Sequence, residues 1–253
     1  MNRQQEMNQL VDSFWKKAFG MEAPFIDRAD EDAGNDDVFA VPKQEQKPIP
    51  LRYEYNNLVT TEQFKTTKIL NEFSGLNINP QVRNFIEALD SYRPAALLGG
   101  AVRDLMYGKT VNDYDVYSYL TKDEALIILG KLKRQFGVQG LTQVVQSQQS
   151  ADPCYDGPVN CVFEFYVAGV DEPIQLVCLN DHPLDYAGRY FSLDICRVGW
   201  TPFPGGDGRI LFTKSFIKVT PGVIGIMNAV NLSNRYLDKI IKKYRPLSIQ
   251  YKG

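Results

Sequence analysis

Two aspartates, Asp113 and Asp115, stand two residues apart in the stretch NDYDVY. If this stretch is a strand, both carboxylates point from the same face. Two like charges so close repel each other unless a cation lies between them. A pair of Mg²⁺ ions would relieve that repulsion, because hard cations bind carboxylate oxygens together with substrate phosphates, and two such ions can activate a hydroxyl and stabilise a leaving group. The alternative is an exposed strand face beside a turn.

A glycine pair, Gly99 and Gly100, precedes these aspartates in the segment LLGGAVRDLMYG. A strand that passes through two glycines directly into a helix exposes unpaired backbone N–H groups and lets another molecule approach the backbone closely. Such a turn is suited to phosphate, and Arg103 follows one helical turn later. Alone, a glycine pair before a helix is a weak signal, because many proteins use it only to turn the chain.

The surrounding residues predict the elements that would position these groups. Apolar runs predict strands over 95–98, 113–120, 190–200 and 210–213, and a hairpin formed by 159–169 and 173–180. Helical spacing, caps and stops predict helices over 60–75, 79–92, 101–108, 121–137 and 231–246. The helix at 121–137 begins with a capping box formed by Thr121 and Glu124. A strand, a turn, a helix and a second strand therefore lie at the centre of a mixed α/β order.

The N-terminal 50 residues differ in character from the rest. Residues 1–20 predict an amphipathic helix, and residues 21–50 an acidic, proline-containing linker or extended arm, with seven acidic residues between Glu22 and Asp37. The helix either docks on the body of the protein, residues 51–253, or binds a protein partner. The C-terminal helix of that body is basic, so it is either a surface for RNA phosphates or a solvated face.

The composition excludes several classes of function. The chain has 253 residues and a net charge of −2, no signal peptide and no apolar run of membrane-spanning length, which together predict a cytoplasmic protein without a membrane partner. His182 is the only histidine, so histidine-based triads and a cysteine–histidine zinc site are disfavoured. The four cysteines have no C-x-x-C spacing and are predicted to be reduced thiols, three of them in buried strands. Catalysis would then depend on carboxylates, Arg, Lys or metal ions.

The segment LLGGAVRDLMYGKTVNDYDVY resembles the head-domain signature of the tRNA CCA-adding enzymes and bacterial poly(A) polymerases, in the polymerase-beta-like nucleotidyltransferase superfamily. The resemblance covers roughly residues 80–200. It implies a mixed five-stranded sheet with helices on one side, two Mg²⁺ ions (or Mn²⁺) on Asp113 and Asp115, and a nucleoside triphosphate such as ATP held near Gly99, Gly100 and Arg103. The positions that match are Gly99, Gly100, Val102, Arg103, Asp104, Gly108, Asp113 and Asp115. Asp104 is expected to brace the turn.

The sequence departs from this family in its later segments. Gln175 stands where the family carries a glutamate, and Tyr190 where it carries an aspartate of the ribose-contacting segment, in which Arg189 matches. Asp194 stands where the family has asparagine, and we predict it as a third catalytic carboxylate. The alternative is a polar residue on the solvated face of the sheet. Glu164 is a weaker candidate, expected on a strand surface.

These departures lead to two functional hypotheses. The first is a head-only nucleotidyltransferase of the kind found in bacteria and phages, which transfers a nucleoside monophosphate from a nucleoside triphosphate to a hydroxyl acceptor. An RNA or tRNA end, a protein and a small molecule all stay open as acceptors, and CCA addition is not expected, because the segments that choose the nucleotide and grip tRNA are not visible. The second is a degenerate module that binds nucleotide or a partner within an assembly.

Overall fold

A computed structural model describes residues 61–65, 76–146, 158–203, 208–217, 222–229, 232, 234–244, 246 and 248–251. The predicted N-terminal helix and acidic arm, residues 1–50, lie outside this range. No helix in the described ranges is both long enough and apolar enough to cross a membrane.

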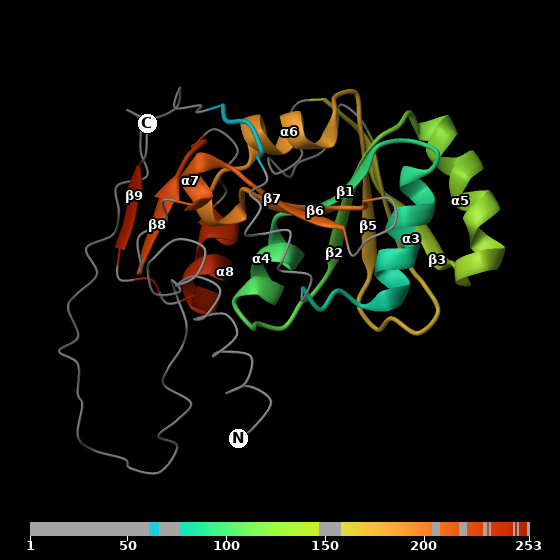
Figure 1. Cartoon of the computed structure of the whole chain (residues 1–253), viewed down its shortest axis with the longest axis horizontal. Coiled ribbons are helices and arrows are strands. Elements are labelled where there is room, and N and C mark those ends of the chain that lie inside the picture. Colours follow the sequence, from blue (N-terminus) through green and yellow to red (C-terminus); the bar gives the residue numbers. More distant parts are fainter. Residues whose placement is uncertain are drawn as a thin grey trace, which may run out of the picture.

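A seven-stranded mixed sheet forms the centre of the molecule, in the strand order β3-β4-β5-β2-β1-β6-β7 (Figure 1). All neighbouring strands are antiparallel except β2 and β5, which are parallel. The strands are β1 (Ala95–Leu98), β2 (Tyr114–Tyr119), β3 (Gln139–Gln146), β4 (Val159–Tyr166), β5 (Ile174–Leu179), β6 (Val198–Thr201) and β7 (Arg209–Phe212). A separate parallel pair consists of β8 (Val223–Ile226) and β9 (Ser248–Tyr251). The predicted mixed α/β class is confirmed, with two more strands than the five expected, because β3 and β7 extend the two edges.

Helices cover both faces of this sheet, whereas one face was expected. They are α3 (Pro80–Asp90), α4 (Gly100–Met106), α5 (Lys122–Phe136), α6 (Pro183–Tyr190), α7 (Lys214–Ile217) and α8 (Asn234–Tyr244), with a 3₁₀ turn η3 (Asp194–Cys196). Side chains of α3 and α5 share the larger apolar core with one face of the strands. On the other face, Tyr186 and Ala187 of α6 pack with Ala96 and Leu98 of β1.

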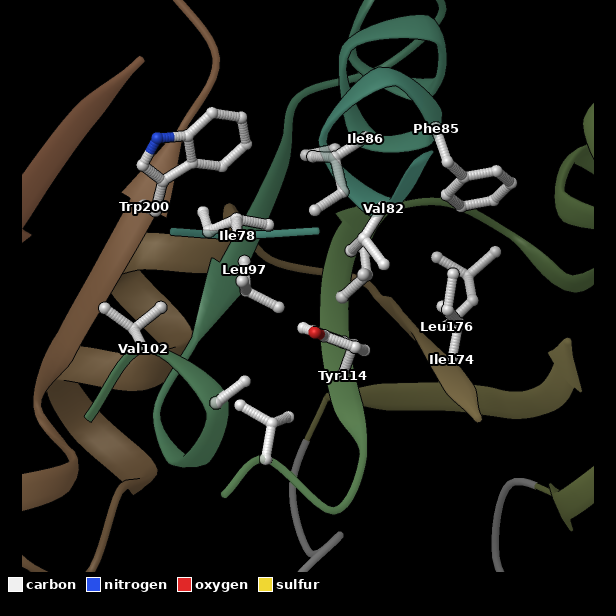
Figure 2. Packing of buried hydrophobic residues seen from close by; sticks show 14 of the residues in the cluster. Ile78, Val82, Phe85, Ile86, Leu97, Val102, Tyr114, Ile174, Leu176 and Trp200 are labelled. Carbon is white, nitrogen blue, oxygen red and sulfur yellow. The ribbon is translucent and has the colours of Figure 1, made fainter. Parts of the chain in front are cut away.

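The larger core follows from the apolar spacing of α3. Val82, Phe85 and Ile86 are fully buried, and Figure 2 shows Val82 and Ile86 pointing from the helix towards Leu97 of β1. The N-cap predicted for this helix is present, because the Asn79 side chain accepts a hydrogen bond from the Gln81 N–H. The sheet that carries Asp115 is therefore fixed by close packing from behind.

Two parts of the sequence fold differently from the prediction. The segment 190–200 is not a continuous strand: α6 extends to Tyr190, η3 follows, and β6 begins only at Val198. Helix α6 begins at Pro183, a first-turn proline, with the His182 side chain as its cap, so its start signal is local. Residues 61–65 are extended rather than helical, since Lys65 pairs with Phe212 in an antiparallel bridge; residues 66–75 lie outside the described range.

Candidate functional site

The glycine turn connects β1 directly to α4, as predicted. Gly99 has φ +71°, a conformation that L side chains rarely adopt, and its N–H donates to the Val198 carbonyl. A Cβ added at Gly99 would stand 2.8 Å from the Phe191 ring, whereas one at Gly100 would meet only ordinary contacts. The first glycine is therefore required by backbone conformation and by close packing.

The two aspartates lie at the start of β2, beside this turn. The antiparallel register pairs Leu97 with Val116, and continuing it places the glycine turn alongside Asp113 and Asp115. Both aspartates are partly exposed, while Tyr114 between them is buried in the core. The strand alternation thus directs both carboxylates away from the core, as the sequence predicts.

Asp115 carries the clearest electrostatic signature of the site. Its pKa is raised from 3.8 to about 7, first because burial removes water from the carboxylate and second because Asp113 adds a like charge. The positive charges of Lys239 and Arg103 act in the opposite direction. A cation between the two aspartates would relieve the repulsion that raises this pKa.

A polar row crosses the sheet next to Asp115. The register places Asp115 of β2 beside Gln175 of β5, and Gln175 beside Glu164 of β4. The Gln175 amide donates a 2.9 Å hydrogen bond to the Glu164 carboxylate. Gln175 reaches the cleft described below, and Glu164 fixes the orientation of its amide from one strand further away.

Helix α8 supplies the wall opposite these carboxylates. Arg235, Asp238, Lys239 and Lys242 are exposed on the helix, while Leu237 and Ile240 are buried on its other side. In Figure 1 the helix lies beside α4 at one end of the sheet. The charge of Lys239 lowers the pKa of Asp115, so the basic helix predicted from the sequence lies close enough to act on this carboxylate.

These elements enclose a cleft of about 1330 Å³. Its volume exceeds the roughly 300–1,000 Å³ typical of a small-molecule pocket. Charged, polar and aromatic side chains from α8, β2, the glycine turn and the end of α6 line it. The lining residues are Leu98, Gly99, Gly100, Lys109, Thr110, Asn112, Asp113, Asp115, Tyr117, Gln175, Tyr190, Phe191, Ser192, Cys196, Arg235, Tyr236, Asp238, Lys239, Lys242 and Lys243.

Arg103 lies behind the cleft rather than in its lining. Its guanidinium is buried and donates to the Asp104 carboxylate at 2.8 Å, to the Tyr244 hydroxyl at 2.7 Å and to the Cys196 sulfur at 2.9 Å. Asp104 also accepts hydrogen bonds from Lys243 and from the Tyr244 hydroxyl. Arg103 and Asp104 therefore join α4 to α8, and Asp104 has the bracing role that the sequence predicted.

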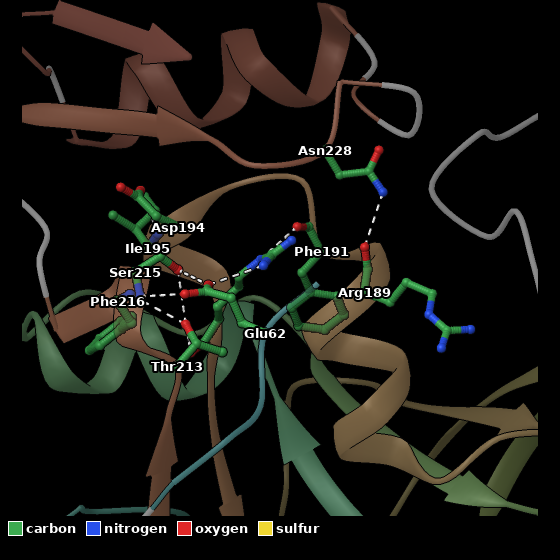
Figure 3. A network of polar contacts seen from close by, with 10 residues as sticks. Glu62, Arg189, Phe191, Asp194, Ile195, Thr213, Ser215, Phe216 and Asn228 are labelled. Atoms are coloured by element: carbon green, nitrogen blue, oxygen red, sulfur yellow. Dashed lines mark hydrogen bonds and ion pairs between the residues drawn. The ribbon is translucent and has the colours of Figure 1, made fainter. Parts of the chain in front are cut away.

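Asp194 and Arg189 are not among the residues that line the cleft. Figure 3 shows both, with the hydrogen bond that the Arg189 carbonyl accepts from the Asn228 amide. Asp194 is fully buried, and its carboxylate accepts from the Ile195 N–H at 2.7 Å and the Gly225 N–H at 2.9 Å, so it joins η3 to β8. This corrects the expectation that Asp194 faces the metals: Ser192 and Asp194 do not share a strand face, because η3 interrupts the strand. Arg189 is exposed, 5.9 Å from the Tyr190 ring.

The sequence did not place three groups of residues in the cleft. Lys109 sits in the short connection after α4, where nothing local marks it as functional. Tyr190 and Phe191 form an aromatic wall with Tyr117, whose ring centroid is 5.6 Å from that of Phe191. Lys239 and Lys242 lie on a helix whose basic face could be read from the sequence, but its position opposite the aspartates could not.

The residues present suit a magnesium site of a particular kind. In the described part of the chain, no group of three or more His, Cys, Asp or Glu side chains gathers as a metal cluster. Mg²⁺ does not need one, because it commonly keeps several waters and binds through one or two carboxylates plus substrate phosphates. Asp113 and Asp115 offer those two carboxylates.

Comparisons with known proteins were made by sequence and by structure. By sequence, the chain matches no protein-family model and no curated protein. By structure, it is similar to the Thermotoga maritima CCA-adding enzyme in complex with tRNA, with a TM-score of 0.51, 18% identity and coverage of 74% of this chain and 43% of that one. It is also similar to a CCA-adding enzyme in apo form II, with a TM-score of 0.50, 16% identity and coverage of 74% and 45%.

These similarities confirm the resemblance predicted from the sequence. The described chain has a fold similar to that of the CCA-adding enzymes over the part that the structures share. At 16–18% identity the likeness extends to the fold alone. The chain spans less than half the length of either enzyme.

Proposed function

We propose that the chain is a metal-dependent nucleotidyltransferase, which transfers a nucleoside monophosphate from a nucleoside triphosphate to a hydroxyl acceptor. The observation that carries this proposal is the pair Asp113 and Asp115, set beside a glycine turn in a cleft whose opposite wall is basic. Paired carboxylates facing cations suit a substrate that carries both phosphates and metal ions. The nucleotidyltransferase fold supports the same reading.

Asp113 and Asp115 are the residues that would hold two Mg²⁺ ions, or Mn²⁺ in their place. When bound, such ions polarise the transferred phosphate and favour ionisation of the attacking hydroxyl. The protein itself contributes positioning and fixed charge, with little covalent chemistry. Helix α3 packs on the sheet, and this packing holds the strand that carries Asp115 in a fixed position.

The reaction balances as a displacement at phosphorus. The acceptor oxygen forms a bond to the α-phosphorus, and the bond from that phosphorus to the bridging oxygen of the β-phosphate breaks. Pyrophosphate leaves with the electron pair, and the hydroxyl proton passes to water in the cleft. No covalent enzyme intermediate is needed.

The size of the cleft favours a second substrate beside the nucleotide. Its 1330 Å³ exceeds what one nucleotide-sized ligand fills. An RNA end is the acceptor that we favour, since it brings a terminal hydroxyl together with bases that can stack on aromatic side chains. The aromatic wall of Tyr190 and Phe191 offers a surface on which a base can stack.

The competing function is a module that binds nucleotide without turnover. One observation favours it: Gln175 occupies the strand position beside Asp115, and its amide is committed to Glu164. A glutamine is no substitute for a metal-binding carboxylate. Such a module would bind nucleoside triphosphates and yield no pyrophosphate.

The test is incubation of the full chain with each labelled nucleoside triphosphate, Mg²⁺ or Mn²⁺, and total RNA, with pyrophosphate release and labelled RNA as readouts. Asp113→Asn and Asp115→Asn should each lower the rate by at least about 100-fold, because each removes one charge from a metal-binding pair. Glu87→Gln, which changes an exposed carboxylate on α3, is the matched control and should retain full activity. Nucleotide binding without product under any of these conditions would favour the module, and equal activity in all variants would refute the assignment of the aspartates.

A further inference from the structure

Helix α8 presents a row of cations to the cleft that the reaction described above does not yet use. Arg235, Lys239 and Lys242 are spaced i, i+4 and i+7, so they lie along one face of the helix. All three are exposed and line the cleft. Within the described residues, none of the three makes an ion pair or a hydrogen bond through its side chain. Their charges are therefore available to a ligand.

The helix that carries them is held rigidly against the rest of the site. The Lys243 ammonium donates to the Asp104 carboxylate and, at 2.8 Å, to the Thr110 carbonyl. The Tyr244 ring packs 5.6 Å from the ring of Tyr107, and its hydroxyl donates to Asp104. The adjacent Lys243 and Tyr244 thus anchor the helix, and the three exposed cations are presented to the cleft from a fixed backbone.

Two other cations that the sequence suggested for the substrate, Arg103 and Arg189, do not line the cleft. Arg103 is paired with Asp104 and Tyr244 inside the protein, and Arg189 is an exposed residue of α6. Among the described residues of the lining, five cationic side chains stand against three carboxylates, a net charge of +2. Most of that positive charge comes from α8.

We propose that Arg235, Lys239 and Lys242 form the subsite that binds the triphosphate group of the nucleotide, with the leaving β- and γ-phosphates against the helix. This inference rests on the proposed function and names the part of the same cleft that recognises the phosphates. The α-phosphate then lies towards Asp113 and Asp115, and the base towards the aromatic wall of Tyr190.

The placement of the row favours a triphosphate over an RNA backbone. From Arg235 to Lys242 the helix rises by roughly 10 Å, a span that flexible Lys and Arg side chains can close around one triphosphate. The same side chains share a cleft with the aspartates rather than extending along the outer surface. Charge developing on the leaving pyrophosphate would be stabilised by cations in this position.

The experiment measures binding of inorganic tripolyphosphate by calorimetry, without metal, in the full chain carrying Asp113→Asn and Asp115→Asn. These two changes remove the carboxylate repulsion and the metal site together, so only the cationic wall is tested. Lys239→Ala and Lys242→Ala should each weaken binding by about tenfold, since each removes a charge-assisted contact. Alanine favours helix, and both lysines are exposed, so folding should be retained. Lys133→Ala, at an exposed lysine of α5, is the matched control and should bind like its parent.

The outcomes separate this inference from the proposed function. Tripolyphosphate binding that is unchanged in both Lys239→Ala and Lys242→Ala would refute the proposed subsite. So would a loss of affinity for a short RNA oligonucleotide while tripolyphosphate binding is retained. If the variants lose tripolyphosphate while the transfer assay yields no product with any acceptor, the subsite stands and the proposed function fails. If transfer proceeds with an unchanged KM for the nucleotide in Lys239→Ala and Lys242→Ala, the function stands and the subsite fails.

Discussion

The ionised carboxylate of Asp115 is unfavourable in the protein when no ligand is bound. Burial and the charge of Asp113 both disfavour its ionised form, and Lys239 offsets only part of this effect. A carboxylate whose pKa is strongly raised in a cleft is typical of functional sites. There, a bound ligand rather than the protein itself compensates the unfavourable charge. The two aspartates should therefore lower the free energy of unfolding of the metal-free protein.

We predict that Asp115→Asn stabilises the metal-free protein at pH 8 by on the order of 1 kcal/mol. The pKa in the folded state, about 7, lies above the ordinary value of 3.8, so the folded protein binds more protons than the unfolded chain between these values. Stability of the wild type therefore falls as the pH rises from about 4 through 7, and the substitution removes this loss. Urea unfolding in EDTA at pH 4 and pH 8 measures it; an equal gain at both pH values would contradict the electrostatic cause.

The common face of Asp113 and Asp115 could be predicted from the sequence, because their spacing of two residues on a strand fixes it. Arg103 and Asp194 could not be placed in this way. Arg103 is paired with Asp104 and with Tyr244, which is 141 residues away in the sequence, and Asp194 with the N–H of Gly225, 31 residues away. Long-range partners of this kind leave no signal near the residue itself.

At the scale of the elements, local signals gave the right result where the fold did not override them. Helix α5 begins with the predicted capping box: the Thr121 hydroxyl accepts from the Glu124 N–H, and the Glu124 carboxylate accepts from the Thr121 N–H at 3.0 Å. The pKa of Glu124 is lowered to about 2, mainly by that backbone hydrogen bond and then by the Arg93 side chain.

We predict that Thr121→Ala destabilises the protein by about 1 kcal/mol, because the Glu124 N–H loses its side-chain acceptor. Thr121→Ser keeps the hydroxyl and should restore most of the loss. Denaturant unfolding of the three proteins at pH 7 measures both effects. A loss in the serine variant as large as that in the alanine variant would show that the threonine methyl, and not the cap, is responsible.

Elements whose limits depend on tertiary contacts were predicted less well. The apolar run at 190–200 reads as one strand, but the buried hydrogen bonds of Asp194 fold its middle into η3. Edge strand β3 was not predicted either; Leu141 and Val144 are exposed apolar residues, and none of the side chains described between 139 and 144 is buried. The segment 61–65 is extended because the Glu62 side chain binds Arg197, which directly precedes β6, and Ser215 of α7, while Lys65 pairs with Phe212 of β7.

At the scale of the whole molecule, a buried group of side chains joins α4, which follows the glycine turn, to the cationic helix α8. Asp104 lies at the centre of a buried group in which Arg103 comes from α4, while Lys243 and Tyr244 come from α8. The carboxylate wall and the cationic wall are far apart in the sequence, and this group sets the distance between them. Its integrity should affect stability and substrate binding together.

We predict that Tyr244→Phe lowers the free energy of unfolding by about 1–3 kcal/mol, because Asp104 and Arg103 each lose a buried partner. The KM for the nucleotide should rise more than kcat falls, since α8 would no longer be held in position. Denaturant unfolding and steady-state kinetics are the measurements. Tyr92→Phe, at an exposed tyrosine, is the control; equal behaviour of the two variants would refute the coupling of the walls.

Because α4 and α8 are far apart in the sequence, the two sides of the cleft are made at different times during synthesis. The aspartates leave the site of synthesis about 120 residues before the lysines that face them, a delay on the order of ten seconds at ordinary elongation rates. Until Tyr244 reaches Asp104, the growing chain has one wall of the cleft and not the other. The cleft beside Asp113 and Asp115 is therefore completed only by α8, the last helix to be made in the described part of the chain.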